Sequence, residues 1–434
     1  MPFRLFTGVL VVIFAGSLLV ASYRTIGAAE PNENACVTCH SKKTPGIVGQ
    51  WKESKHAAMG VDCASCHGAT AGTPGAVKHY LGSYVNPLVT PKTCAQCHPD
   101  EEKEFSASHH ANAAKFIGSL DNVLGEMIEG GPAANQGCKQ CHGSTVKVLA
   151  DGTLDANTWP NSGIGRLNPD GSAGDCNACH GRHNFSLAQV RTPETCGKCH
   201  LGPDHPQMEI YNESKHGIAY HANLDKMKLG SEKWVVGQDY SAAPNCATCH
   251  MGATPGQPVT HDVGARISWT LRPPISTKLE KADTKRAAMQ DVCAQCHGKA
   301  HIDAHYKQYD ATVNLYNDKF AKPAKEIMDQ LYAAKLLTPT PFDEKLEWTY
   351  YLLWHHEGRR ARHGAAMMGP DYVQWHGMFE VADRFYNEFL PQARALKPEL
   401  VDAVLNRPEH RWIKGMAKDD REKILQYYKE HYGQ

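Results

Sequence analysis

The sequence predicts a mainly α-helical protein, and three observations support this fold class. Alternation of apolar and polar residues, the pattern typical of β-strands, is sparse along all 434 residues. Eight copies of one short motif occupy the chain between Cys36 and His297, joined by segments rich in glycine and proline. From about Tyr306 onward the chain contains no cysteine and shows long apolar periodicity at helical spacing.

The repeated motif is Cys-x-x-Cys-His, and it accounts for all 16 cysteines. The cysteine pairs are Cys36/Cys39, Cys63/Cys66, Cys94/Cys97, Cys138/Cys141, Cys176/Cys179, Cys196/Cys199, Cys246/Cys249 and Cys293/Cys296, and the histidines that follow them are His40, His67, His98, His142, His180, His200, His250 and His297. This motif attaches c-type haem: two thiols add to the vinyl groups of one porphyrin, and the adjacent imidazole binds the iron. The sequence therefore predicts eight covalently bound c-type haems.

Other uses of paired cysteines explain the pattern less well. Zinc sites do not require a histidine after every second cysteine. Disulfides between residues three apart would constrain almost nothing, and a thioredoxin-like redox pair would occur once rather than eight times.

The spacing of the motifs leaves too little protein per haem for conventional layered packing. We therefore expect a mainly α multihaem cytochrome c with a haem-packed core over residues 30–305, built of short helices and loops such as 68–75 and 163–174. Residues 306–434 should form a C-terminal helical region without haem. Its helical periodicity is carried by Ile327, Leu331, the 346–354 stretch around Trp348, Met378, Val381, Phe385 and Phe389, and its helices should be punctuated by Pro323, Pro339, Pro341, Pro370, Pro391 and Pro398.

The N-terminus, residues 1–29, resembles a secretory signal. Arg4 precedes an apolar run from Leu5 to Ala21, and Gly27-Ala28-Ala29 offers a cleavage site. An uncleaved membrane anchor is the alternative, and in either case the haem-bearing part should be periplasmic. Lys+Arg and Asp+Glu both total 46, so the charge balance gives no argument for a nucleic-acid partner.

Seventeen histidines lie outside the motifs and could close haem irons as second axial ligands. Three share an aromatic-x-x-Ser-x-His repeat, which favours a common ligand role over incidental histidines at exposed helix ends: His56, His110 and His216. Further candidates are His183, His261, His301 or His305, and His355, His356 or His363. The haem that each would close stays open.

Three longer segments resemble the octahaem hydroxylamine oxidoreductase family. They are Cys196-Gly-Lys-Cys-His200-Leu-Gly-Pro-Asp204-His205 with its continuation to Tyr211 and His216, Thr260-His261-Asp262 through Trp269, and His355-His356-Glu357-Gly358-Arg359-Arg360. The resemblance covers essentially the mature chain. It implies a homotrimer or a multiple of it, seven bis-histidine haems, and one catalytic haem on the fourth motif, Cys138, Cys141 and His142.

The same resemblance implies that Asp204 and His205 line the open face of the catalytic haem. A histidine beside a carboxylate can pass protons near neutral pH, which suits a reaction that moves protons with electrons. The alternatives are that Asp204 caps a helix after Gly202-Pro203 and that His205 is another axial ligand.

The resemblance further implies an oxidoreductase of nitrogen compounds. Pentahaem nitrite reductases and octahaem tetrathionate reductases fit less well, because they carry lysine in place of the proximal histidine at the active haem. In the oxidative branch of the resembling family a tyrosine from a neighbouring subunit bonds to the catalytic porphyrin. This chain places Phe379 at the expected position, with Tyr372 as the competing candidate; Phe379 could also be a core residue of an amphipathic helix.

We therefore expect reduction of nitrite and hydroxylamine to ammonium. Hydroxylamine or hydrazine oxidation is the first alternative, and a non-catalytic electron conduit is the second. The redox partner should be a separate cytochrome or a membrane quinol dehydrogenase.

Overall fold

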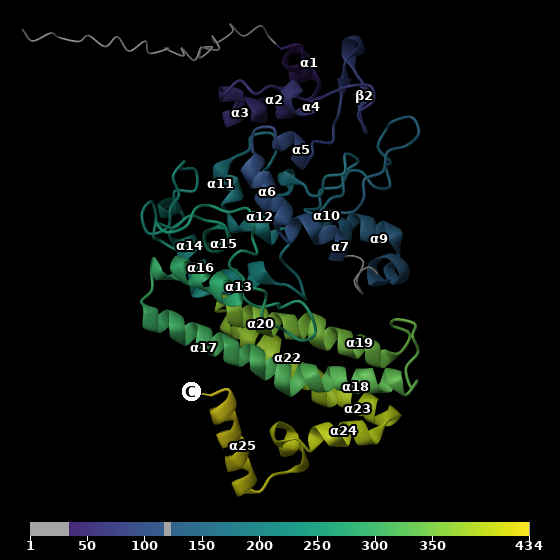
Figure 1. Cartoon of the computed structure of the whole chain (residues 1–434), viewed down its shortest axis with the longest axis vertical. Helices are drawn as coiled ribbons and strands as arrows, with labels where there is room; N and C mark the ends of the chain where they lie inside the picture. The colour runs from purple at the N-terminus through teal and green to yellow at the C-terminus, as the bar shows by residue number, and fades with distance from the viewer. Residues whose placement is uncertain (1–33, 117–122, 434) are drawn as a thin grey trace, which may run out of the picture.

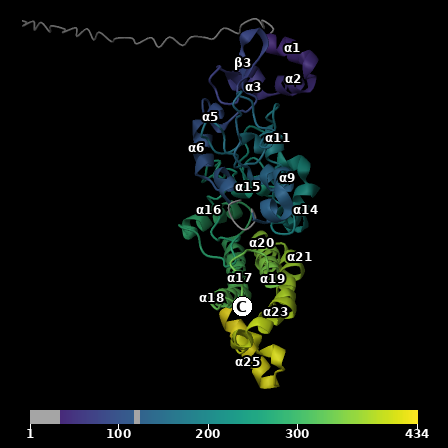
Figure 2. The ribbon, with the colours of Figure 1, turned by 90° about the vertical axis from the view of Figure 1, so that its right-hand side faces the viewer.

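The computed structural model describes residues 34–116 and 123–433 (Figure 1). The expected signal or anchor at residues 1–29 lies outside these residues. Within the described ranges, no helix combines the length and the apolar composition needed to cross a membrane. The molecule is elongated: the first helices occupy one end of its long axis and the last helices the other, as two perpendicular views show (Figures 1 and 2).

The motif-bearing part consists of short helices and turns joined by long loops. In chain order they are α1 (Ala35–Lys43), α2 (Pro45–Lys52), α3 (Lys55–Ala58), α4 (Cys63–His67), η1 (Tyr80–Gly82), α5 (Pro91–Cys94), α6 (Pro99–Ala107), η2 (His110–Asn112), α7 (Ala113–Phe116), η3 (Val123–Gly130), α9 (Gly131–Gln136), α10 (Cys138–His142), η4 (Cys176–Ala178), α11 (Leu187–Val190), α12 (Pro193–Gly197), α13 (Gln207–Glu213), α14 (Lys215–Ala222), η5 (Leu224–Met227), α15 (Cys246–His250) and α16 (Ala282–Ala294). Three two-residue strands, β1 (Gly68–Ala69), β2 (Val77–Lys78) and β3 (Tyr84–Val85), form an antiparallel sheet in the order β1-β3-β2. The expected mainly helical fold is confirmed.

The C-terminal part is built from three long helices in which α-helical and π-helical stretches follow one another without a break. The first comprises α17 (Lys299–Tyr316), η6 (Asn317–Ala321) and α18 (Lys322–Ala333); the second α19 (Lys345–Tyr351), η7 (Leu352–Glu357) and α20 (Gly358–Met367); the third α21 (Pro370–Val373), η8 (Gln374–Phe379), α22 (Glu380–Asp383), η9 (Arg384–Phe389) and α23 (Leu390–Leu396). They are followed by α24 (Pro398–Leu405), η10 (Pro408–Lys414) and α25 (Lys418–His431).

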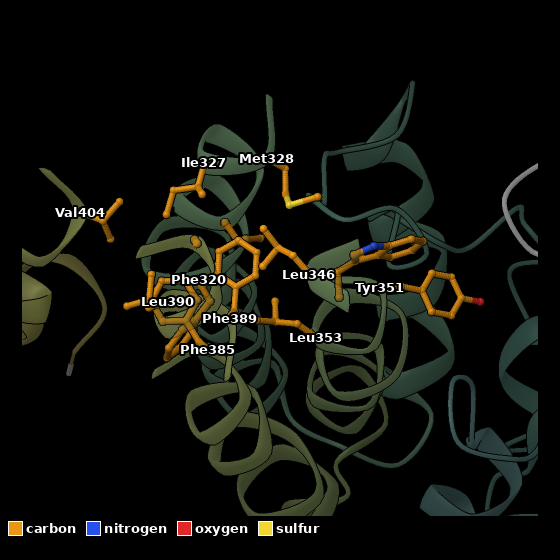
Figure 3. Packing of buried hydrophobic residues seen from close by; sticks show 14 of the residues in the cluster. Phe320, Ile327, Met328, Leu346, Tyr351, Leu353, Phe385, Phe389, Leu390 and Val404 are labelled. Atoms are coloured by element: carbon orange, nitrogen blue, oxygen red, sulfur yellow. The ribbon is translucent and has the colours of Figure 1, made fainter. Parts of the chain in front are cut away.

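These helices enclose the main hydrophobic cluster (Figure 3). Ile327, Leu331, Val381, Phe385 and Phe389, which helical spacing placed on buried faces, are each at most 1% exposed. Burial of one such side chain contributes roughly 1.5–3 kcal/mol. The C-terminal part therefore has an ordinary side-chain core of its own.

Two of the prolines expected to punctuate helices do not end them. Pro323 and Pro391 lie inside continuous helices, each the second residue after a π-helical stretch, η6 and η9 respectively. Proline has no N–H to donate to the preceding turn, and a π-helical turn shifts the hydrogen-bond register locally. The π stretches therefore offer a physical reason why these helices continue through proline.

The expected division between residues 305 and 306 falls inside α17. His301, His305 and Tyr309 of this helix line the large cavity described below, whereas its last residue, Tyr316, belongs to the main hydrophobic cluster. The absence of cysteine after His297 therefore does not coincide with a structural break.

Helix α20 joins the two parts of the molecule. It packs against α17, α21, η8 and the motif-proximal helix α13. Gly358 permits the close approach to α17, because a Cβ atom there would lie 2.5 Å from the hydroxyl oxygen of Tyr316. Residues of α20 are thereby brought beside the segment that contains Asp204 and His205.

Candidate haem centres and active site

One continuous cavity of about 2950 Å³ runs through the motif-bearing part. The histidines of all eight motifs line it, as do 14 of the 16 motif cysteines, the exceptions being Cys39 and Cys138. Pockets for single organic ligands are typically about 300–1,000 Å³. The residues present therefore fit several porphyrins held side by side, and such porphyrins would fill the space that side chains leave open.

Local sequence explains how the motifs adopt helical turns. Asn34, Asp62, Asp175 and Asn245 precede four of them, and each side chain accepts a hydrogen bond from a backbone N–H of the following turn. On a helical turn, residues three and four apart share one face. Both thiols and the imidazole of a motif can therefore face one porphyrin.

Six motif histidines lie opposite a second histidine at a spacing that suits one shared iron. With a metal–nitrogen distance of about 2 Å on each side, two axial imidazoles have ring centroids roughly 6 Å apart. The observed centroid distances are 5.9 Å for His40–His79, 6.2 Å for His67–His183, 6.3 Å for His98–His56, 6.3 Å for His180–His261, 6.1 Å for His200–His110 and 6.1 Å for His297–His216. Five of the distal candidates from the sequence occur in these pairs: His56, His110, His183, His216 and His261.

Burial keeps several of these rings neutral, which is the form that binds iron. It lowers the pKa of His110 to about 4, with His250 and His109 adding to the effect. It also lowers the pKa of His180 to about 4 and that of His200 to about 3.

The aromatic-x-x-Ser-x-His repeat marks the end of one helix and the start of the next. In each copy the serine Oγ donates a hydrogen bond to the carbonyl oxygen of the aromatic residue three positions earlier: Ser54 to Trp51 at 2.7 Å, Ser108 to Phe105 at 2.6 Å and Ser214 to Tyr211 at 2.7 Å. The same Oγ accepts a backbone N–H of the next turn. The helix thus ends at the serine, and the histidine lies in the first turn of the next helix. His56, His110 and His216 face the third, sixth and eighth motifs, respectively.

His79 was not singled out from the sequence. It belongs to no repeat, and it reaches His40 because the β2–η1 segment folds back beside α1. The remaining candidates lie elsewhere: His301 stacks on His297 with centroids 4.6 Å apart, which is too close for opposite faces of one iron, and His305 packs against Tyr306 and Tyr309.

The seventh motif has two histidines in its neighbourhood. His250 lowers the pKa of His110, and it hydrogen-bonds the backbone of Val263. The next residue, Gly264, is so close to His109 that a Cβ atom would lie 3.1 Å from the His109 ring. His109 is therefore close to the seventh motif, while His110 already faces His200.

Thiols of different motifs touch one another. Cys94 hydrogen-bonds Cys176, Cys141 hydrogen-bonds Cys199, and Cys196 hydrogen-bonds Cys246. These bonds raise the pKa of the Cys176, Cys199 and Cys196 thiols. These contacts join the third motif to the fifth, the fourth to the sixth and the sixth to the seventh.

Asp204 and His205 follow the sixth motif and lie in one cluster with residues of η7 and α20. The Oδ2 atom of Asp204 lies 3.1 Å from Arg359 Nη1, 3.6 Å from His205 Nε2 and 3.9 Å from His355 Nε2. These contacts with Arg359 and His355 were not anticipated from the sequence, because more than 150 residues separate the two segments. Asp204 caps no helix: α13 begins at Gln207 with Pro206 at its N-cap.

The position of His205 is compatible with two roles: second axial ligand opposite His200, or proton carrier. Its ring centroid is 6.1 Å from that of His200, the same distance as that of His110. Its Nδ1 atom is buried and has no hydrogen-bond partner among the residues that the structure describes. Since His110 lies at the same distance and can serve His200 as second ligand, His205 is not required in that role.

Phe379 is not a core residue, which corrects one alternative from the sequence. Its side chain is 53% exposed and packs edge-on against Trp375, which is 59% exposed. Both lie on the outer face of η8, whereas Val381 and Phe385 on the next turns face the core. Tyr372 is half-buried and contacts the ring of His376.

Comparison with protein families supports the haem assignment. Residues 170–342 match the family described as "Seven times multi-haem cytochrome CxxCH", residues 126–201 match "Cytochrome c7 and related cytochrome c", and residues 21–68 match "Cytochrome c554 and c-prime".

Two curated proteins resemble parts of this chain. A probable nitrite reductase-hydroxylamine oxidoreductase fusion protein of Kuenenia stuttgartiensis is 24% identical over 369 residues, 70% of this chain and 38% of the relative. The C-type polyheme cytochrome OmcB of Geobacter sulfurreducens is 29% identical over 131 residues, 29% of this chain and 16% of the relative. The chain thus spans well under half the length of these relatives.

Solved structures share the fold. A hypothetical multiheme protein superposes with a TM-score of 0.73 at 23% identity, over 85% of this chain and 95% of that one. The reducing HAO-like protein complex of Kuenenia stuttgartiensis superposes with a TM-score of 0.62 at 22% identity, over 84% and 85%. The chain is therefore a mainly helical multihaem cytochrome c, related at low identity to HAO-like proteins.

Proposed function

Because the chain is a multihaem cytochrome c, we propose that it is an exported octahaem enzyme that reduces nitrite, and hydroxylamine, to ammonium. The fourth motif would hold the catalytic haem, and the other seven haems would relay electrons. The observation that carries this proposal is the cluster around the Asp204 carboxylate: His205 and Arg359 line the haem cavity with it, and His355 approaches the same carboxylate.

The cluster lies close to the fourth motif. Cys141 touches Cys199, and His205 contacts His200 of the same sixth motif. Asp204 and His205 line the cavity together with Cys141 and His142. A substrate bound on the open side of the fourth haem would therefore be within reach of this cluster.

The distal histidines support the relay. Six motifs face a second histidine at the spacing of a bis-histidine iron, and His109 is our candidate for the seventh, that of His250. A six-coordinate iron exchanges electrons without binding substrate. The thiol contacts join the third motif to the fifth, the fourth to the sixth and the sixth to the seventh, so haems held by these motifs would be neighbours.

Reduction of nitrite consumes six electrons and eight protons and yields ammonium and two waters. Haem bound at the fourth motif would supply the electrons and an iron for the nitrogen atom. The His205 ring, which lines the cavity and whose Nε2 atom faces Asp204, would pass protons to the substrate. Asp204 would hold the orientation of the ring, and His355 on the other side of the carboxylate would replace the proton.

The direction of the reaction rests on two observations. The family resemblance aligns Phe379, with Tyr372 as the competing candidate, with the cross-linking tyrosine of the oxidative branch, and phenylalanine lacks the phenolic oxygen. In addition, the curated relative is named as a nitrite reductase fused to a hydroxylamine oxidoreductase. Hydroxylamine or hydrazine oxidation and a non-catalytic electron conduit are the competing functions.

A pair of steady-state assays on the haem-loaded protein tests the proposal. Nitrite with a reduced viologen dye should be converted to ammonium faster than hydroxylamine is oxidised with an added electron acceptor. The reverse order would favour the oxidative function. A resting ferric spectrum with eight low-spin haems and no high-spin or weakly ligated haem would favour the conduit.

The proposal also covers the location, the oligomeric state and the electron donor of the enzyme. We propose a periplasmic location, a homotrimer or a multiple of it, and a separate cytochrome or membrane quinol dehydrogenase as electron donor. Crosslinking and gel filtration of the haem-loaded protein would test the trimer.

A further inference from the structure

The cysteines show which motifs are neighbours in space. Burial raises the pKa of several motif thiols, and the charge of a thiol from another motif raises it further, so the two motifs lie close together. Besides the hydrogen-bonded thiols described above, such pairs are Cys36 with Cys63, Cys94 with Cys66, Cys196 with Cys179, and Cys293 with Cys249. The first, second, third, fifth, sixth, seventh and eighth motifs therefore follow one another, and the fourth branches from the sixth.

The first motif is one end of this series and lies at one end of the molecule. Helix α1, which carries the motif, and strand β2 lie at the end of the long axis opposite the C-terminal helices (Figure 1). Cys39 is exposed and does not line the cavity, whereas Cys36 does. Because the two cysteines bind the vinyl-bearing edge of a porphyrin, this edge of a haem on the first motif would be close to the surface beside Cys39.

Exposed lysines surround Cys39. Lys42 and Lys43 follow it by three and four residues in α1, so the three side chains lie on one side of the helix. Lys78 directly precedes His79, whose ring faces the histidine of the first motif. These three lysines, which we call the basic surface, are exposed and form no ion pair with a described residue.

The two ends of the motif series differ in charge. Residues 34–98, which span the first three motifs, contain six lysines and no arginine, against one aspartate and one glutamate. Residues 282–310, which surround the eighth motif, contain four basic and four acidic residues. There Lys299 forms an ion pair with Asp303 at 2.5 Å. The first motif is thus the end that attracts a negatively charged protein.

We propose that the basic surface is the docking site of an acidic redox protein that exchanges electrons with the haem of the first motif. This inference rests on the electron relay of the proposed function and adds the chemistry of the redox partner. Opposite charges steer two proteins together and orient them, which mainly raises the rate of association. Each encounter transfers one electron, which oxidises the carrier and reduces one ferric haem to the ferrous state.

Stopped-flow absorbance tests the docking site without nitrite. The oxidised, haem-loaded full chain is mixed with a reduced acidic [2Fe–2S] ferredoxin, and the second-order rate of haem reduction is measured. Lys42→Glu/Lys43→Glu is the test variant. Lys299→Glu/Lys307→Glu is the matched control, because it changes the net charge equally at exposed positions of α17, next to the eighth motif. The Kd of oxidised ferredoxin is measured for each protein, and an unchanged ferric haem spectrum shows that the variants are folded.

At about 20 mM salt, Lys42→Glu/Lys43→Glu should lower the rate about 10-fold or more and raise the Kd, whereas the control should stay within about 2-fold of wild type. Lys42→Gln/Lys43→Gln should lie between wild type and the charge-reversed variant. As a measurement that needs no variant, raising the salt to about 0.5 M should slow the reaction of wild type about 10-fold or more.

Equal effects of the two charge-reversed variants, a larger effect of the control, or a rate independent of salt would overturn the docking site. A Lys42→Glu/Lys43→Glu protein that loses binding to vesicles containing phosphatidylserine but keeps its ferredoxin rate would do so too, because the surface would then contact a membrane.

The outcomes separate the docking site from the proposed function. A rate that depends on the lysines, in a protein that forms no ammonium from nitrite with reduced viologen, would support the docking site and refute the reductase. Ammonium formation together with a ferredoxin rate that does not depend on the lysines would do the reverse.

Discussion

The Oδ2 atom of Asp204 lies 3.6 Å from the Nε2 atom of His205. Both side chains line the cavity. A histidine beside a carboxylate suits a group that passes protons to a substrate.

Replacing His205 by alanine should lower nitrite turnover by roughly 10²-fold or more, the scale for loss of a proton-transfer group. Haem content should not change, because His110 rather than His205 would close the sixth haem. His376→Ala is the matched control: this exposed histidine also contacts carboxylates, those of Glu380 and Asp371, but lies outside the cavity wall. Unchanged turnover in His205→Ala would remove His205 from the mechanism.

His79→Ala tests the distal ligand that has no sequence signature. Its ring faces His40 at 5.9 Å, so its loss should convert one low-spin haem, that of the first motif, into a high-spin haem. Electron paramagnetic resonance of the oxidised protein would show this as one additional high-spin signal. His221→Ala, which removes an exposed histidine bonded to Asn212, should leave the spectrum unchanged. A wild-type spectrum in His79→Ala would mean that another residue binds this iron.

The number of haems is a separate prediction. The intact mass should exceed that of the processed polypeptide by eight haems, because the 16 cysteines form eight motifs and all eight histidines line the cavity. Mass spectrometry of the denatured protein measures this directly, since thioether-linked haem stays attached. A mass with seven haems or fewer would show that one motif carries none.

The phenylalanine at position 379 leads to a prediction about whether the chains separate in denaturing electrophoresis. Without a phenolic oxygen at this position, boiling in detergent should release single chains, with a polypeptide of 47.8 kDa before processing and haem attachment. A trimer that survives boiling would reveal an inter-subunit link, with Tyr372 as the next candidate, and would weaken the reductive assignment.

The C-terminal core should be sensitive to acid through His410. Its side chain is fully buried beside Tyr386, whose hydroxyl lies 2.7 Å from His410 Nδ1. Burial lowers the pKa of His410 to about 3, and Lys319 and Arg407 add to this.

The unfolded chain therefore binds a proton at this position that the folded chain excludes, between about pH 6.5 and pH 3. Stability should fall with decreasing pH across this window, by about 3 kcal/mol at pH 4. Guanidinium unfolding of His410→Gln and wild type, followed by tryptophan fluorescence at pH 7 and pH 4, measures the difference. An equal loss of stability in both proteins would exclude His410 as the cause.

The sequence alone determined the chemistry of haem attachment and the helical character of the C-terminal part. Covalent attachment needs only residues close in sequence, because both thiols and the proximal imidazole belong to one helical turn. Likewise, the buried positions of Phe385 and Phe389 follow from the period of one helix. The repeat around Ser54, Ser108 and Ser214 could be recognised for the same reason: its hydrogen bonds are local.

Only the tertiary structure decided which histidines meet. The distal histidine of a haem comes from a distant segment, as His183 does for His67, and sequence spacing contains no information about that distance. His79 and the contacts of Asp204 with His355 and Arg359 were missed for this reason. The exposure of Phe379 and the passage of helices through Pro323 and Pro391 depended in the same way on packing and local hydrogen-bond register, which neighbouring helices set and residue type alone does not.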